Sequence, residues 1–171
     1  MSSRHGTFTT SLGDLLFVAE GDALAGVYFP EHRYPPEPEA IGEDLGTEPN
    51  DPVLTEAARQ LRQYLAGDRV EFNIALAPQG DNFSQQVWAM LQQIPYGTTT
   101  TYGELAASLG NRALAQRVGQ AVGHNPVSVV IPCHRVLGAD GSLTGFAGGL
   151  ERKRTLLALE EPAAADAGRL F

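Results

Sequence analysis

Short runs rich in apolar and β-forming residues lie near the start of the chain, and glycine–aspartate pairs separate these runs. The runs cover residues 7–12, 15–20 and 24–29. Such runs with turn residues at this spacing are typical of β-hairpins. The pattern predicts a small antiparallel sheet, and the alternation of apolar with polar or small residues over residues 70–76 predicts a half-buried strand that returns to it.

A helical period begins after residue 51. Asp51 followed by Pro52 is typical of an N-cap and a first helical position, and Gly67 is typical of a stop. Apolar residues recur between them at three- and four-residue spacing. Before this helix, residues 30–52 contain six prolines and seven acidic residues, so we expect a mobile loop there.

Further capping signals divide the second half of the chain into helices. Asn82 with Gln85 resembles a capping box that opens a helix with a wide apolar stripe. Thr101 with Glu104 forms a second capping box, which opens a short helix. The first of these helices is therefore predicted to pack against a core.

A short interval separates that short helix from the next one. Gly110 stops the first helix, and Asn111 caps a second over residues 112–122. This is the spacing of a helix-turn-helix, whose second helix usually meets DNA. Small residues dominate the second helix, which suits close approach to a narrow groove better than readout of base edges.

These elements predict an α+β fold in two domains. Residues 1–80 form a small N-terminal antiparallel sheet with a helix, and residues 81–171 form a mostly helical domain with the helix-turn-helix. No apolar run approaches the roughly 20 residues needed to span a bilayer, and no signal-peptide pattern is evident. We therefore expect a cytoplasmic protein with no membrane partner.

Charge is divided unevenly along the chain. The net charge of -8 argues, at face value, against a nucleic-acid partner. Residues 1–80 hold 5 basic and 13 acidic side chains, however, whereas residues 82–155 hold 6 basic and 3 acidic ones. The segment with the helix-turn-helix is positive, so modest and salt-sensitive DNA binding is compatible with the sequence.

Cys133 is the only cysteine of the chain. A single cysteine excludes an internal disulfide and a multi-cysteine zinc site, and it suits a reducing compartment. His5 and His32 have no neighbouring ligands in the sequence, so we expect surface histidines and no metal site. No motif points to a cofactor.

The cysteine lies between Pro132 and His134, and Arg135 follows. A thiol attacks as its thiolate, and at an ordinary pKa of roughly 8.5 only a few per cent is ionised at neutral pH. His134 is a candidate base, and Arg135 is a candidate cation that favours the thiolate. The alternative is a small buried hydrophobe at the end of an apolar strand over residues 127–131.

A longer pattern favours the nucleophile. Asn125-Pro126, the run 131–136 and the run 145–149 together resemble the active-site signature of the O6-alkylguanine-DNA alkyltransferases, and the resemblance extends from about residue 83 to residue 160. It implies single-turnover transfer of an alkyl group from O6-alkylguanine in double-stranded DNA to Cys133. O4-alkylthymine stays open as a substrate. We expect no cofactor, no metal and no obligate protein partner, and hence a monomer.

The resemblance also implies roles for DNA-facing residues. Arg117 inserts into the base stack where the target nucleotide has left, and Tyr102 crowds the adjacent phosphate. Arg135 is expected at the same interface, and Asn125 matches the hinge asparagine of the family. A solvated Arg117 and a packed Tyr102 are the alternative interpretations.

A pocket for the flipped base is implied in the glycine-rich loop 138–149. Val136 offers a carbonyl and Ala147 an N–H in this interpretation. Phe146 stands where many members carry tyrosine, so a hydroxyl contact is expected to be absent and the selectivity of the pocket to differ.

A last helix is predicted over residues 150–161, ended by Pro162. Glu160 lies on or near its inward stripe, where a buried carboxylate needs a partner. We expect His134 to be that partner, and Glu160 matches the acid of the family. The basic run 152–154 is expected to be solvated.

Two other classes of protein stay open. One is a non-catalytic protein that binds alkylated bases, although such relatives have the cysteine replaced. The other is a helix-turn-helix regulator whose cysteine senses oxidation or alkylation.

Overall fold

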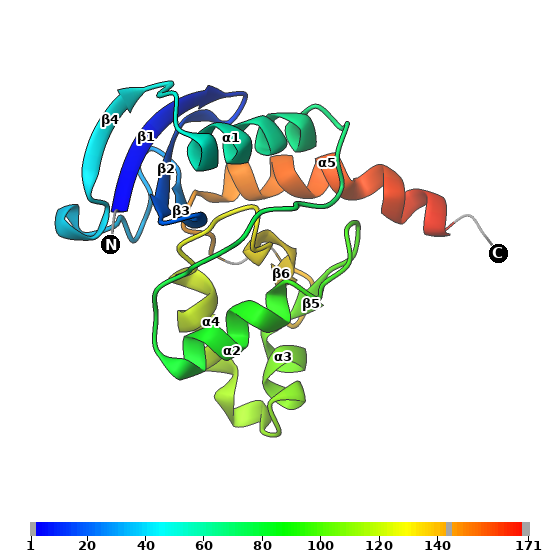
Figure 1. Cartoon of the computed structure of the whole chain (residues 1–171). Coiled ribbons are helices and arrows are strands. Elements are labelled where there is room, and N and C mark those ends of the chain that lie inside the picture. Colours follow the sequence, from blue (N-terminus) through cyan, green and yellow to red (C-terminus); the bar gives the residue numbers. More distant parts are fainter. Residues whose placement is uncertain (1–2, 143–144, 169–171) are drawn as a thin grey trace. The chain divides into compact units, whose positions relative to one another are not determined.

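The structure is a computed structural model that describes residues 3–142 and 145–168, with side chains as far as residue 161. The chain divides into two compact units. Figure 1 shows their helices and strands, coloured along the sequence. The first unit contains Met1–Gln79 and Pro126–Val130, and the second contains Gly80–Asn125 and Ile131–Phe171. The expected division at residues 80 and 81 had left residues 126–130 in the second domain, whereas they pack with the first unit.

A four-stranded sheet forms the first unit, in the order β3-β2-β1-β4. Its strands are β1 (Ser3–Thr10), β2 (Gly13–Glu20), β3 (Ala23–Tyr28) and β4 (Glu43–Thr47). The first three strands pair antiparallel, as the hairpin spacing predicts. Strand β4 pairs parallel with β1 at the edge of the sheet.

The prediction of a loop over residues 30–52 is wrong for part of that segment. It contains β4 and a short 3-10 helix, η1 (Pro38–Ala40). Backbone pairing with β1 orders the segment, and its own composition carries no signal of that partner. The predicted surface positions of two histidines also need correction. The ring of His5 contacts the carbonyl of Ile41 at 3.0 Å, and buried His32 accepts a hydrogen bond from Phe29 N–H at 3.2 Å.

Helix α1 (Pro52–Leu65) begins as predicted, because the Asp51 carboxylate accepts hydrogen bonds from two N–H groups of its first turn. Its apolar face supplies Leu54 and Leu61 to the core. The strand predicted over residues 70–76 is reduced to one β-bridge, between Leu24 and Leu76. Val70 is 53% exposed. From Phe72 to Leu76 the apolar residues are half-buried and the residues between them exposed, so the predicted half-buried face is present although the segment is not a strand.

The second unit is mostly helical. Its elements are α2 (Asn82–Leu91), β5 (Thr100–Thr101), α3 (Tyr102–Ser108), η2 (Arg112–Leu114), α4 (Ala115–Gly123), η3 (Cys133–Arg135), β6 (Val136–Leu137) and α5 (Leu150–Gly168). Strands β5 and β6 pair parallel, which places the start of α3 beside the segment that follows the cysteine.

The caps of these helices follow the predicted chemistry with one shift. Asp81, and not Asn82, caps α2, since its carboxylate accepts from Ser84 N–H at 2.8 Å. Thr101 caps α3, and the Asn111 side chain accepts from Ala113 N–H at 2.9 Å. The second helix of the helix-turn-helix therefore starts as a 3-10 turn and continues as α4.

Two expectations around the cysteine are corrected. Residues 127–131 do not form a strand, because Val129 has a φ of 71° and turns the chain. The segment keeps isolated bridges, one of them between Val27 and Val127. Helix α5 does not end at Pro162 but continues to Gly168. The hydrogen bond that this proline removes does not stop the helix here.

In the described ranges, none of the helices combines the length and apolar character that crossing a membrane requires.

Candidate active site

Cys133 begins the 3-10 turn η3 in the interior of the second unit, and it is 5% exposed. Its backbone N–H donates to the carbonyl of Ile131 at 2.8 Å. Asn125 fixes the same place from the other side, because its Nδ2 donates to the Ile131 carbonyl at 2.8 Å and its side chain also bonds the thiol. The predicted hinge asparagine therefore lies against the nucleophile.

Burial raises the pKa of the Cys133 thiol. The hydrogen bond from Asn125 and the positive charge of Lys153 both act in the opposite direction. The resting thiol is accordingly protonated at neutral pH, and a base is needed to make it nucleophilic.

His134 is fully buried and pairs with Glu160 of α5, at 2.9 Å between Nε2 and Oε2. A hydrogen bond to a carboxylate places the proton on Nε2 and leaves the lone pair of a neutral ring on Nδ1. Burial lowers the pKa of His134, although Glu160 opposes this effect. The ring is therefore held neutral, which is the form that accepts a proton.

Arg135 does not face solvent. Its Nε and Nη2 donate to the two oxygens of Glu160 at 2.9 and 2.8 Å, and Nη1 donates to the carbonyl of Ile94 at 2.6 Å. The side chain is 8% exposed. This burial argues against the expected contact with DNA, and the pairing with Glu160 occupies the charge that we expected to act on the thiolate.

Glu160 is consequently held by several donors at once. Besides His134 and Arg135, the N–H of Gly97 donates to its Oε1 at 3.3 Å. Four donors on two carboxylate oxygens favour the ionised carboxylate and fix its orientation.

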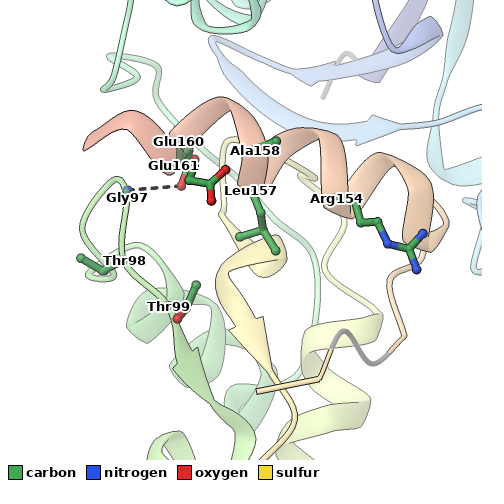
Figure 2. Close-up of a pocket in the computed structure, with 8 residues that line it drawn as sticks. All are labelled: Gly97, Thr98, Thr99, Arg154, Leu157, Ala158, Glu160 and Glu161. Carbon is green, nitrogen blue, oxygen red and sulfur yellow. Dashed lines mark hydrogen bonds between the residues drawn. The ribbon is translucent and has the colours of Figure 1, made fainter. Parts of the chain in front are cut away.

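A pocket of about 350 Å³ lies where the loop before β5 meets α5 (Figure 2). Figure 2 shows the Gly97–Glu160 hydrogen bond at one end of this pocket and Arg154 toward the other. Its lining consists of Gly97, Thr98, Thr99, Arg154, Leu157, Ala158, Glu160 and Glu161. The pocket therefore adjoins the acid of the network, and Cys133 does not line it.

The basic run of α5 is not uniformly solvated, contrary to expectation. Arg154 is exposed and Arg152 is half-buried, but Lys153 is fully buried. Its Nζ donates to the carbonyl of Val136 at 2.7 Å. Burial lowers the pKa of Lys153 to about 8, and the thiol of Cys133 acts against this shift.

A signal for Lys153 was present in the sequence. Glu160 was placed inward by helical spacing, and Lys153 precedes it by seven residues, or two turns, on the same face of α5. Because residues 152–154 are all basic, the run was interpreted as one solvated face, although the helical spacing places Lys153 on the buried stripe.

The DNA-facing candidates lie on the helix-turn-helix. Tyr102 is half-buried at the start of α3, and its ring lies near Gly119 of α4. Arg117 of α4 is exposed, and its guanidinium lies 3.9 Å from the centroid of the Phe83 ring. Arg117 is thus stacked on Phe83 of α2 while it stays exposed to solvent.

The residues expected to form the base pocket are only partly described. Val136 is buried, and its carbonyl accepts from Lys153. Phe146 and Ala147 are half-buried in a turn closed by Gly149 N–H on the Phe146 carbonyl at 2.9 Å. Residues 143 and 144 of the same loop lie outside the described residues.

Fold and site together define a class of protein: a two-unit α+β protein that joins a helix-turn-helix to a buried cysteine with a histidine–glutamate pair. Comparison with known proteins identifies the family. The DNA binding domain of the 6-O-methylguanine DNA methyltransferases matches residues 82–162, and their ribonuclease-like domain matches residues 3–78. The chain belongs to this family.

Individual relatives agree along almost the whole chain. A methylated-DNA--protein-cysteine methyltransferase of Mycolicibacterium paratuberculosis is 42% identical over 154 residues, which cover 90% of this chain and 90% of the relative. One from Methanosarcina acetivorans is 40% identical and covers 91% of this chain and 97% of its own length. The crystal structure of Mycobacterium tuberculosis OGT in complex with DNA has a TM-score of 0.82 and 38% identity, and covers 94% of each chain.

Proposed function

We propose that this protein repairs DNA directly, by transferring an alkyl group from O6 of a guanine to Sγ of Cys133. The observation that carries this proposal is that His134, next to the only cysteine on the same 3-10 turn, forms a buried pair with Glu160 of α5. Relatives named methylated-DNA--protein-cysteine methyltransferases and the relative crystallised with DNA support it.

The proposed chemistry is a nucleophilic displacement. His134 accepts the thiol proton, directly or through a water molecule, while Glu160 holds the ring. The thiolate then forms an S–C bond to the alkyl carbon as the C–O6 bond breaks. The electron pair stays on the guanine, which takes up a proton. The product is a thioether, which has no easy route back, so one protein molecule repairs one lesion.

Access to O6 requires the damaged nucleotide to leave the duplex. In the proposed reaction Arg117 fills the gap that it leaves, and Tyr102 at the start of α3 crowds the neighbouring phosphate. Arg117 must then exchange its contact with Phe83 for a contact with bases. Both residues lie on the helix-turn-helix, which is the element expected to meet DNA.

The extruded base is proposed to bind next to the loop after η3. The Val136 carbonyl keeps a lone pair beyond the one that Lys153 uses, and Ala147 offers an N–H. Phe146 provides apolar surface without a hydroxyl. A pocket that depends on main-chain groups is compatible with O4-alkylthymine as a second, weaker substrate.

Intact-mass measurement tests the proposal. After incubation with a duplex that contains O6-methylguanine, the protein should gain one methylene equivalent at Cys133, and Cys133→Ser should gain none. Repeated turnover would indicate a hydrolase. Sequence-selective binding to undamaged DNA without a mass gain would indicate the regulator, and lesion binding without a mass gain would indicate a non-catalytic relative.

A further inference from the structure

Helix α4 turns two glutamines away from the core of the second unit. Gln116 and Gln120 are exposed and lie four residues apart, which is about one helical turn. The core side of the helix carries Val118, Ala121 and Val122. Each glutamine precedes a buried valine by two residues, and two residues turn a helix by about 200°. The two amides therefore lie on the side opposite the core.

Contacts with two neighbouring helices fix the orientation of this outward face. On one side Trp88 of α2 donates from Nε1 to the carbonyl of Ala121 at 2.8 Å, and the guanidinium of Arg117 is stacked on α2 as well. On the other side the Tyr102 ring of α3 lies near Gly119. The glutamines lie between these two lines of contact, so the backbone that carries them is held from both sides.

The surroundings of the glutamines favour close contact with a duplex. Gly119 and Gly123 each follow a glutamine by three residues, so they lie near the same face and add no side chain to it. Residues 111–123 contain two arginines and no acidic residue, which suits the phosphates of DNA. The small residues that dominate this helix therefore allow the two amides to reach base edges in a narrow groove.

A glutamine amide has a specific use in the minor groove, the narrower groove of B-DNA. It both donates and accepts hydrogen bonds. Every base pair offers acceptors in the minor groove, but only the N2 amino group of guanine is a donor there. The NH2 group of a glutamine can therefore bond to any base pair, whereas its carbonyl oxygen finds a partner only at a G·C pair.

We propose that Gln116 and Gln120 read the minor groove of the base pairs beside the target nucleotide and favour G·C pairs there. This inference rests on the proposed function, because that function brings α4 to a duplex. It adds a preference for sequence context that the reaction itself does not require. Arg117 and Tyr102 act at the extruded nucleotide, whereas the glutamines contact base pairs that stay stacked.

Short undamaged duplexes in which inosine replaces every guanine test this contact. Inosine lacks the N2 amino group and keeps the major-groove edge of guanine. Binding of the full-length protein to the guanine and inosine duplexes is measured by fluorescence anisotropy at fixed salt. The replacement should weaken binding by roughly two- to tenfold, as expected for the loss of a neutral hydrogen bond. A preference of this size is far below the selectivity of a regulator for its operator.

Two substitutions assign the response to the glutamines. Gln116→Met and Gln120→Met remove the amides and keep unbranched side chains of similar length. The double variant should bind both duplexes equally, and its affinity should fall with salt as steeply as that of the unmodified protein, because no charge is removed. Gln93→Met is the matched control, since Gln93 is exposed in the same unit but follows α2, outside the helix-turn-helix. This control should keep the response to inosine.

Several results would overturn the proposal. One is a response to inosine that persists in the double variant, whether or not its thermal stability changes. Another is equal binding, or no binding, of the two duplexes by the unmodified protein. A response lost equally in Gln93→Met would also overturn it, because the effect would then not belong to α4.

The groove contact and the proposed reaction fail in different ways. If the response to inosine depends on the glutamines while the unmodified protein gains no mass from O6-methylguanine DNA, the groove contact stands and the proposed reaction does not. A mass gain at Cys133 without any response to inosine would leave the reaction intact and remove Gln116 and Gln120 from recognition.

Discussion

Charged side chains serve different purposes in the two units. In the first unit two ion pairs are exposed: Arg62 pairs with Glu48, and Arg59 pairs with Glu56, with each side chain between 43% and 52% exposed. The Arg4–Asp51 pair of this unit is more enclosed, with side chains 16% and 12% exposed. Surface pairs of this kind contribute little to stability. In the second unit His134, Lys153 and Glu160 are almost inaccessible to solvent.

This difference indicates that the second unit keeps buried charged groups that lower its stability but serve the chemistry of its site. Buried ionic groups cost several kcal/mol each unless they are well paired, so a fold selected for stability alone avoids them. Their concentration around one cysteine therefore marks the site, independently of any motif. Removing charges from each unit tests whether buried and exposed charges differ in this way.

Glu160→Gln should produce the largest effect. It leaves Arg135 as an uncompensated buried cation, which typically costs about 3–5 kcal/mol, and it weakens the support of His134. We expect that loss in the free energy of unfolding by urea, and a roughly 100-fold slower alkyl transfer. Glu161→Gln is the control, since Glu161 is exposed and adjacent. Equal losses in both variants would refute the distinction between buried and surface charge.

Lys153→Met should have the opposite effect on stability. The folded state lowers the pKa of Lys153 from 10.5 to about 8, so the unfolded chain binds more protons between these values and stability rises with pH across that window. Below pH 8 the full penalty applies. The variant should be more stable at pH 7, by at most about 3 kcal/mol.

Urea titrations at pH 7, 8, 9 and 10 check this prediction. The advantage of Lys153→Met should shrink as the pH rises above 8. A variant that is less stable at every pH would mean that the lysine stabilises the fold, and the second unit would then resemble the first.

Asp51→Ala tests a charge that stabilises the first unit. Asp51 caps α1 and pairs with Arg4, so its loss should cost about 1–2 kcal/mol. The hydrogen bond from Arg4 holds the pKa of Asp51 below its usual value of 3.8. Its contribution is therefore present above pH 4, and the difference between the two proteins should fade at lower pH. Thiol alkylation by iodoacetamide should be unchanged, and a changed rate would contradict the separation of roles.

Phe83→Leu should give the smallest effect. An exposed cation–π contact is worth about 0.5–1 kcal/mol, and the proposed reaction requires Arg117 to leave Phe83. Binding to a duplex that contains O6-methylguanine should tighten by roughly two- to fivefold, measured by fluorescence anisotropy at fixed salt. Combining Phe83→Leu with Arg117→Ala should abolish the gain. Weaker binding by Phe83→Leu alone would instead show that Phe83 helps to present Arg117.

The sequence predicted most of what depends on local chemistry. Caps predicted the starts of α1 and α3, and β-rich runs with turn residues at hairpin spacing predicted the antiparallel pairing of β1 to β3. Helical spacing placed Glu160 on the buried face of α5 with His134 as its partner. Each of these features is determined by residues only a few positions apart, or by a periodicity.

The predictions differed from the structure where pairing with a distant strand, or the direction of a side chain within a short turn, determines the structure. Strand β4 exists because β1 offers an edge to a segment whose composition favours disorder. Arg135 follows Cys133 by two residues, yet a 3-10 turn rotates successive side chains by about 120°, so adjacency in sequence gives different directions. Arg135 therefore reaches Glu160 and the carbonyl of Ile94, a direction that its place beside Cys133 in the sequence did not indicate.

The burial of Cys133 bears on the lifetime of a protein that, in the proposed reaction, acts only once. Oxidants and electrophiles consume exposed thiolates, and each such event before a lesion arrives would inactivate one molecule. Cys133 is 5% exposed and burial raises its pKa, so its enclosure protects the thiol from both kinds of reagent. In the proposed reaction, the reactive thiolate forms only when His134 removes the proton.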